Sequence, residues 1–375
     1  MTGPRIPAKT LALLRPLAKA ARREGLSLYA VGGCVRDWIL GRQDVKDLDL
    51  VTEGDPSGLA QLCARLLGGK AEAFGAFGTL RVKGDDWRVD FAASRQEEYP
   101  EPACLPKVAP APLERDLFRR DFTINAMAVR LEPQDAGGLV DPYGGRRDLK
   151  AKVLRVLHPA SLRDDPTRVF RAARFLCRLK LKPAPGMRDM AREVLEKGVA
   201  VRLSRHRIAA ELMRILAEEA PEAPLRLLRS WGYLDLVHPR LPVKVRGGSV
   251  EERLFSLALA VGGKGNGFLA SLPVEHGMSR RIREALNLCR QKASPRAALE
   301  PGVCRLAALA FPCLPRTALH PLFLRGSDLH AAGLTPGPAF SAVLDEAARE
   351  QWTGKMSSRG QALRWLERRL RRAAC

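Results

Sequence analysis

Two aspartates are spaced so that their carboxylates share one face of a short strand. Asp47 and Asp49 alternate with Leu48 and Leu50 in the run Asp-Leu-Asp-Leu-Val, residues 47–51. Successive side chains of a strand point to opposite faces, so both carboxylates lie on one side and both leucines face the core. Adjacent carboxylates repel each other unless a divalent cation lies between them, and hard oxygen ligands suit Mg²⁺. The pair therefore predicts a metal site.

A third carboxylate on a neighbouring strand would complete a site for two metals, which favours in-line displacement at phosphorus. Asp90 is the candidate, because it lies in the second arm, 88–92, of a predicted hairpin. The first arm is 79–82, and Gly84-Asp85-Asp86 between the arms is typical of a hairpin turn. We therefore expect Asp90 to join Asp47 and Asp49 in catalysis.

A glycine pair precedes the two aspartates. Gly32 and Gly33 follow the apolar run 28–31, a pattern that predicts a strand opening into a helix. Paired glycines let a phosphate approach the backbone N–H groups at a helix start, where the dipole favours an anion. Arg36, one turn into that helix, can reach the same phosphate. Alone, such a turn is weak evidence for function, and the aspartates that follow it are what favour a nucleotide site.

A basic segment follows the predicted sheet. It reads Arg-Arg-Asp-Phe-Thr-Ile-Asn-Ala-Met-Ala over residues 119–128, and we expect a helical stretch at 124–129. Arg120 would neutralise the charge of a triphosphate. Asp121 and Asn125, four residues apart, would share a helix face and could contact a ribose hydroxyl. Without the other motifs, this segment would be an ordinary basic helix start.

A second basic segment, residues 163–175, predicts a helix whose first turn contains Pro166, just after Asp164. Its polar residues recur every third position and form one ridge: Asp165, Arg168, Arg171 and Arg174. A charged ridge is usually a solvated surface. The alternative is that the carboxylate and the first guanidinium read the edge of a base while the later arginines hold phosphates.

The elements that must position these residues change type along the chain. Short apolar runs broken by Gly and Asp predict strands at 28–31, 48–51, 79–82 and 88–92, and helical periodicity takes over after about residue 153. We therefore expect an α+β fold, with a mixed-sheet head over 1–150 followed by an all-helical remainder. Two segments are expected to lack regular structure: the proline-rich segment 99–112 and the glycine-rich turn 262–267.

Composition bounds the function. The chain has 375 residues, 63 Lys and Arg against 41 Asp and Glu, and a net charge of +22, which predicts a polyanionic partner, with nucleic acid ahead of an anionic membrane. No apolar run is long enough for a signal peptide or a membrane span. The eight cysteines are scattered without a Cys-x-x-Cys pair, which indicates free thiols in a reducing cytoplasm.

Together these motifs resemble, in order and over nearly the full length, the tRNA nucleotidyltransferase/poly(A) polymerase family, in its bacterial-type CCA-adding branch. The segments that carry the resemblance are the glycine turn with the aspartate pair, the basic segment 119–128, the turn Asp-Pro-Tyr-Gly-Gly at 141–145, the helix of 164–175, the helix of 204–216 that braces it, and the tail segment 326–338.

The resemblance implies a polymerase-β-like nucleotidyltransferase head (1–150), a helical neck with the motif that selects the nucleotide (151–218), and a helical body and tail that bind the acceptor arm of tRNA (219–375). It implies Mg²⁺ on Asp47 and Asp49, and ATP or CTP as the donor for the tRNA 3′ end. It further implies that Asp165 and Arg168 read the base. The triphosphate ligands would be Gly33, Arg36, Arg120, Arg171 and Arg174.

One departure bears on the nucleotide that is added. CCA-adding members commonly begin the selecting motif with Glu-Asp, and this chain has Asp164-Asp165-Pro166. That form, with the segments 53–55 and 99–112, looks more like members that add only the final A. A poly(A) polymerase remains an alternative, although the tail segment favours tRNA. A non-catalytic RNA-binding protein and a sugar- or antibiotic-modifying transferase are more distant alternatives.

Overall fold

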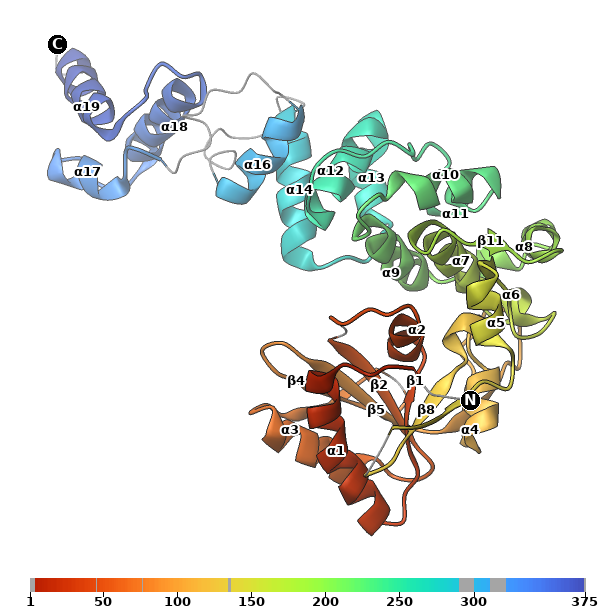
Figure 1. The fold of residues 1–375 in the computed structure, drawn as a ribbon. Helices are drawn as coiled ribbons and strands as arrows, with labels where there is room; N and C mark the ends of the chain where they lie inside the picture. The colour runs from red at the N-terminus through yellow and green to blue at the C-terminus, as the bar shows by residue number, and fades with distance from the viewer. Residues whose placement is uncertain are drawn as a thin grey trace. The chain divides into compact units, whose positions relative to one another are not determined.

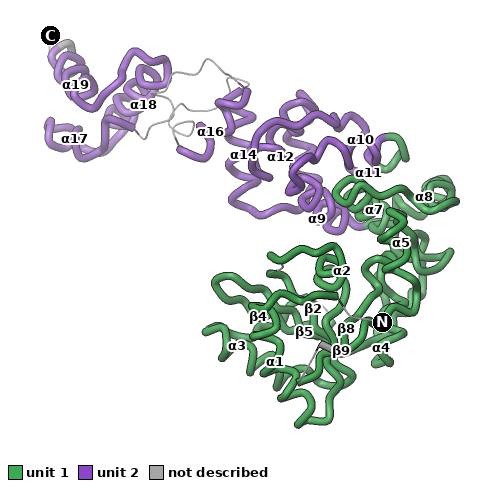
Figure 2. Tube along the Cα trace, in the orientation of Figure 1, with its two compact units in different colours: residues 1–203, 230–233 green, residues 204–229, 234–375 purple. Residues whose placement is uncertain are grey.

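The computed structural model describes residues 4–44, 46–75, 77–133, 136–289, 300–310 and 322–373. The chain divides into two compact units (Figure 2). The first contains residues 1–203 and 230–233, and the second contains residues 204–229 and 234–375. All the predicted site residues belong to the first unit.

A mixed sheet forms the centre of the first unit. Within the described residues it has seven strands in the order β3-β4-β5-β2-β1-β8-β9 (Figure 1). β2 and β5 pair in parallel, and the other neighbours are antiparallel. The strands are β1 Leu28–Val31, β2 Asp47–Thr52, β3 Ala71–Phe74, β4 Thr79–Lys83, β5 Arg88–Ala93, β8 Ala128–Leu131 and β9 Ala136–Val140.

The alternation along β2 divides its side chains between two cores. Leu48 and Leu50 are buried with α1 Ala8–Arg23, α2 Gly33–Ile39 and α3 Ser57–Leu66. Val51 lies on the opposite face, that of the two aspartates, and packs against α4 Leu113–Phe118. Burial of Leu48 and Leu50 thus sets the orientation of β2 and turns Asp47 and Asp49 to the other face, as the sequence predicts.

The rest of the first unit is mostly helical. A hairpin of β6 Arg95–Glu98 and β7 Lys107–Pro110 stands beside the main sheet. Two short strands, β10 Val153–Leu154 and β11 Lys182–Pro183, pair in parallel, and two helices lie between them in the sequence. The helical elements are η1 Thr123–Asn125, α5 Gly145–Lys150, α6 Ser161–Asp164, α7 Thr167–Arg178, α8 Met187–Glu196 and η2 Ala200–Arg202.

Helices are the regular elements of the second unit, and no strand is found among its described residues. Apolar stripes on its longer helices bury residues such as Leu212, Leu254 and Ile282. Its helices are α9 Arg205–Leu216, α10 Glu222–Ser230, α11 Leu234–Val237, α12 Val250–Ala260, η3 Gly262–Lys264, α13 Gly265–Ala270, α14 His276–Cys289, α16 Pro301–Ala310, α17 Gly326–Ala331, α18 Pro338–Trp352 and α19 Arg359–Ala373. In the described part of the chain, no helix is long and apolar enough to cross a membrane.

The mixed-sheet head followed by a mostly helical remainder confirms the expected α+β fold, and the small β10–β11 pair is the exception in the helical part. The hairpin around residues 84–86 is also confirmed, with Gly84 N–H donating to the carbonyl of Trp87 at 2.9 Å. The proposed division at residues 150 and 218 stays a prediction, since the compact units divide the chain at residue 203.

Three local predictions are wrong. The expected helix at 124–129 is the short η1 followed by strand β8, because this apolar run pairs with both β1 and β9. Segment 99–112 contains β7, whose pairing with β6 outweighs its prolines. Segment 262–267 is helical in η3 and α13, where burial of Phe268 offsets the low helix propensity of glycine.

The cysteines agree with the expected absence of a disulfide framework as far as they are described. Cys313 and Cys375 lie outside the described residues. The others are present as thiols: Cys34, Cys63, Cys104, Cys177, Cys289 and Cys304. Burial raises the pKa of the Cys34 and Cys63 thiols to about 12, so both are protonated at neutral pH.

Candidate active site

The two aspartates of β2 form the centre of the site. Asp47 and Asp49 are exposed on one face of the strand, and Asp49 is in register with Asp90 on β5. The carboxylate of Asp49 has solvent-accessible area, but the protein atoms around it desolvate its charge and raise its pKa, while the positive charge of Arg120 acts in the opposite direction. Arg88 pairs with Asp47 at 2.9 Å.

Asp90 lies where the sequence predicts, beside Asp49 on the neighbouring strand. Both of its carboxylate oxygens accept hydrogen bonds from Arg81, at 2.7 Å from Nε and 2.6 Å from Nη2. The Arg81 guanidinium lies 3.2 Å from the ring centroid of Phe74. Asp90 therefore has a strong bidentate partner within the protein, and its part in catalysis stays a prediction.

The glycine turn brings an arginine next to the aspartates. Gly32 has φ +72° and ψ −124°, a conformation that residues with a Cβ rarely adopt. A Cβ at this position would lie 2.7 Å from Nη1 of Arg120 and 3.8 Å from Oδ2 of Asp49. Glycine therefore permits both the turn and the close approach of Arg120. A Cβ at Gly33 would meet only Nη2 of Arg36, at an ordinary 3.7 Å.

A chain of hydrogen bonds joins α2, η1 and α7. Arg36 Nη1 donates to Asn125 Oδ1 at 2.6 Å, and Asn125 Nδ2 donates to Asp121 Oδ1 at 3.0 Å. Arg171 Nε then donates to Asp121 Oδ2 at 2.8 Å, and Nη2 of Arg171 forms an ion pair with the same oxygen at 2.6 Å. Although the two residues do not share a helix, Asp121 and Asn125 are in contact as expected. The other donors of Arg36 bond to Asp37.

Asp121 is ionised at neutral pH in this chain. Its burial desolvates the charge and by itself would raise the pKa, but the charge of Arg171 and the hydrogen bonds from Asn125 and Arg171 hold the pKa below its ordinary value. The carboxylate thus fixes the orientation of Arg171 relative to η1.

The predicted ridge on α7 is not a solvated surface. Arg168 and Arg174 are buried, and Arg168 donates to Ser161 Oγ at 2.5 Å and to the carbonyl of Arg119 at 2.7 Å. Asp165 Oδ1 accepts from the N–H and the hydroxyl of Thr167, the first residue of α7. Asp164 ends α6 and pairs with Arg163 at 3.6 Å.

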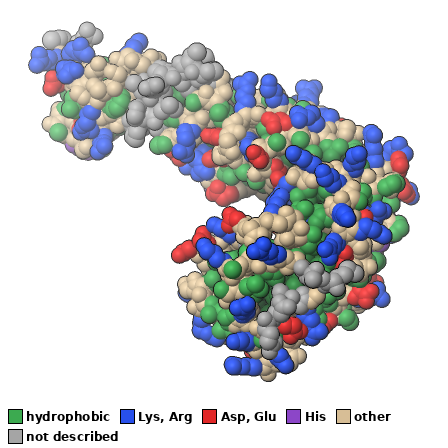
Figure 3. Space-filling view, in the orientation of Figure 1, with side chains coloured by type: hydrophobic (Ala, Val, Ile, Leu, Met, Phe, Trp, Pro, Cys, Tyr) green, Lys and Arg blue, Asp and Glu red, His purple; other side chains and the backbone are tan. Residues whose placement is uncertain are grey.

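Positive charge gathers around Phe175 on α7. The guanidinium carbons of Arg36, Arg171 and Arg174 lie 5.2, 5.8 and 5.2 Å from the centroid of its ring. Asp37 pairs with Arg36 and Asp121 pairs with Arg171, so the protein itself already compensates part of this positive charge. Figure 3 shows Lys and Arg side chains distributed over the visible face of the protein, among hydrophobic and acidic ones.

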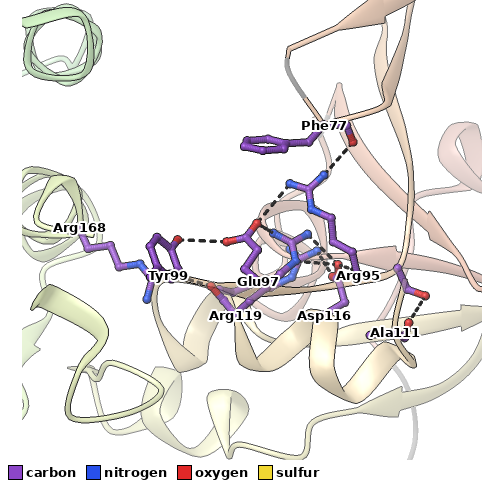
Figure 4. A network of polar contacts seen from close by, with 10 residues as sticks. Phe77, Arg95, Glu97, Tyr99, Ala111, Asp116, Arg119 and Arg168 are labelled. Atoms are coloured by element: carbon purple, nitrogen blue, oxygen red, sulfur yellow. Dashed lines mark hydrogen bonds and ion pairs between the residues drawn. The ribbon is translucent and has the colours of Figure 1, made fainter. Parts of the chain in front are cut away.

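The sequence-based predictions missed a group of residues beside this site, which Figure 4 shows. Glu97 and Asp116 are buried carboxylates that bind Arg95, Arg119 and Arg120. The one sequence signal is the spacing of four residues between Asp116 and Arg120, which is typical of an ion pair where the segment is helical.

The carboxylates suit a divalent cation. Asp47 and Asp49 offer hard oxygen donors from one strand face, and the desolvated charge of Asp49 is one that a cation would stabilise. Within the described residues, no group of three or more His, Cys, Asp or Glu side chains is arranged to hold a metal ion. The assignment of a metal ion to Asp47 and Asp49 stays a prediction.

Comparisons with known proteins agree on one family. The model of the poly A polymerase head domain matches residues 28–155. An A-adding tRNA nucleotidyltransferase of Aquifex aeolicus is 42% identical over 210 residues, which are 56% of this chain and 25% of that protein. A CC-adding tRNA nucleotidyltransferase of Deinococcus radiodurans is 33% identical over 90% of this chain and 88% of that protein.

A solved structure of a tRNA nucleotidyltransferase, complexed with a primer tRNA and an incoming ATP analogue, is 27% identical to this chain with a TM-score of 0.61. The match covers 96% of this chain and 99% of that one. The chain spans only about a quarter of the length of the Aquifex protein.

Proposed function

This chain belongs to the tRNA nucleotidyltransferase/poly(A) polymerase family, and we propose that it transfers a nucleotide from ATP or CTP to the 3′ end of tRNA. One observation supports the proposal: three features lie together around Gly32. They are the exposed carboxylate of Asp49, the guanidinium of Arg120, and the chain of hydrogen bonds that leads from Arg36 through Asn125 and Asp121 to Arg171. Carboxylates for a metal and guanidiniums for a triphosphate are what phosphoryl chemistry requires.

In the proposed reaction, the 3′ oxygen of tRNA forms a bond to the α-phosphorus while the bond from that phosphorus to the bridging oxygen breaks. The hydroxyl proton passes to solvent, and pyrophosphate leaves. Asp47 and Asp49 would bind Mg²⁺, which when bound supplies charge neutralisation and a lower pKa of the attacking hydroxyl. Positioning of the two reactants in line accounts for much of the rate of such reactions.

The cationic side chains would bind the nucleotide donor, ATP or CTP. Arg120, Arg171 and Arg174 would neutralise the triphosphate, and Asp121 with Asn125 would contact the ribose. Arg36 supports this contact through its bond to Asn125. Asp165 and Arg168 would select the base from the start of α7, because the bonds of Arg168 to Ser161 and to the Arg119 carbonyl hold its guanidinium in one orientation.

The partner of the second unit would be the acceptor arm of tRNA. A net charge of +22 supports binding to a phosphate backbone, mostly without sequence specificity. We place the reaction in the cytoplasm, in keeping with the scattered cysteines.

For the nucleotide, we propose AMP addition to a tRNA that ends in CC, from the Asp164-Asp165 start of the selecting motif. A second candidate is CMP addition, which is favoured by the near full-length match to a CC-adding relative. The proteins in these comparisons differ in the nucleotide they add, so the choice needs a direct assay.

That assay uses the purified chain with tRNA ending at the discriminator base, at C or at CC, each with ATP, CTP or both. Extension by one A of tRNA ending in CC, with no extension of the two shorter substrates, supports AMP addition. Extension of the shorter substrates by CTP alone assigns CMP addition. Equal extension of an unstructured RNA, with many A residues added, would identify a poly(A) polymerase and contradict the proposal.

A further inference from the structure

Charged side chains of alternating sign form a connected row that begins on β6 and includes Arg95, Glu97, Arg119 and Asp116 (Figure 4). Arg95 lies 3.3 Å from Glu97, and Glu97 accepts from Arg119 Nη1 at 2.8 Å. Arg119 in turn donates to Asp116 Oδ1, from Nε at 3.0 Å and from Nη2 at 2.7 Å. The row continues from Asp116 Oδ2 to Arg120 Nη2, at 2.9 Å.

Asp116 is the member of this row that touches Arg120. Its side chain is fully buried. Its Oδ1 accepts from Arg119, and its Oδ2 accepts from Arg120. Burial acts to raise its pKa, but the charges of both arginines hold the pKa below the ordinary value, so the group is an anion at neutral pH. The Asp116–Arg119–Arg120 cluster is therefore an ion triplet inside the protein.

Arg120 lies between two carboxylates but bonds to one of them. The positive charge of Arg120 is coupled electrostatically to both Asp116 and Asp49. Nη1 of Arg120 and Oδ2 of Asp49 both lie within 4 Å of the place that a Cβ of residue 32 would occupy. Within the described residues, however, no ion pair joins the two side chains. Nε of Arg120 is buried without a hydrogen-bond partner in the described part of the chain, so the bond to Asp116 is what orients the guanidinium.

We propose that Asp116 is a positioning residue, which holds Arg120 away from Asp49 and so keeps the guanidinium available for the triphosphate and Asp49 available for a cation. The inference rests on the proposed function, since it assigns the residue that places one triphosphate ligand. A neutral side chain at position 116 leaves the Asp49 carboxylate as the strongest anionic partner of Arg120. The two groups then pair, and the pairing obstructs the nucleotide and the cation together.

The test is a double-mutant cycle of Asp116→Asn and Arg120→Gln, with kcat and KM measured for ATP on tRNA ending in CC and with ATP affinity measured by calorimetry without tRNA. Displacing a positioned group by about 1 Å costs roughly 100-fold in rate. We expect each single variant to lose about that factor in kcat/KM and to bind ATP more weakly. The double variant should stay within about threefold of Arg120→Gln, because both changes remove one interaction.

A matched control separates positioning from loss of stability. Asp148 is another buried aspartate of the first unit, and it binds Thr123 Oγ1 and Arg155 rather than Arg120. Asp148→Asn should lower the unfolding temperature but leave the KM for ATP unchanged. If Asp116→Asn does not fold, Asp116→Glu can replace it, because it keeps the charge and moves the carboxylate by one methylene. Asp116→Glu should raise the KM for ATP, by a smaller factor than Asp116→Asn.

The outcomes are distinct. A folded Asp116→Asn variant with unchanged ATP affinity and kcat/KM would overturn the inference, as would losses that simply multiply in the double variant. Wild-type activity of Arg120→Gln would instead contradict the role of Arg120 in the proposed function. Absence of any nucleotide transfer by the unmodified chain would contradict the proposed function itself.

Discussion

Replacement of Gly32 by alanine tests the geometry of the site most directly. At φ +72° and ψ −124°, a residue with a Cβ is strained by roughly 1–3 kcal/mol. The new Cβ would also lie 2.7 Å from Nη1 of Arg120, so the guanidinium must move by several tenths of an ångström or more. Because we propose that Arg120 binds a phosphate of the donor, we expect kcat/KM to fall roughly 100-fold.

Two other glycines separate strain from displacement. Gly25 has φ +69°, and a Cβ added there would have no atom within 4 Å, so Gly25→Ala should lose about 1 kcal/mol of stability and keep full activity. At Gly33 a Cβ would make only an ordinary contact with the protein, so Gly33→Ala should keep its stability but bind ATP more weakly, because the added Cβ would keep a phosphate from the backbone. The assay compares urea unfolding with single-nucleotide extension of tRNA for all three variants. Gly32→Ala activity equal to that of Gly25→Ala would refute the placement of Arg120 beside this turn.

Asp47→Asn and Asp49→Asn should each abolish transfer while a filter-binding assay shows unchanged tRNA affinity; normal turnover of either variant in Mg²⁺ would remove the metal assignment. Arg168→Ala should reduce discrimination among ATP, CTP, GTP and UTP by about 5- to 150-fold. Arg174→Ala should instead raise the KM for all four nucleotides. If Arg168→Ala lowers kcat/KM equally for all four, Arg168 does not read the base. Asp121→Asn should cost stability at pH 7. The pKa of Asp121 in the folded state lies below its ordinary 3.8, so the difference in stability should disappear as the pH falls below 3.8 and through the folded-state pKa. A difference in urea stability between Asp121→Asn and the unmodified chain that is independent of pH would show that the charge is not responsible.

Elements whose pattern is local could be predicted from the amino-acid sequence. The alternation of Asp47 to Leu50 predicts both the strand and the face of each side chain, because the period of a strand is a property of its backbone. The periodicity of α7 and the turn residues at 84–86 are equally local, and both predictions are confirmed. The chemistry of the site, carboxylates beside a glycine turn, follows from residue types and spacing.

Packing between elements settles what those local patterns leave open. The apolar run at 128–131 suits a helix or a strand, and it is a strand because β1 and β9 supply partners on both sides. The charged ridge of α7 would usually be a solvated surface, but contacts with Ser161 and the Arg119 carbonyl bury Arg168. The contact of Arg120 with Gly32 joins residues far apart in the chain. Such contacts depend on how whole elements pack, and no window of sequence contains both partners.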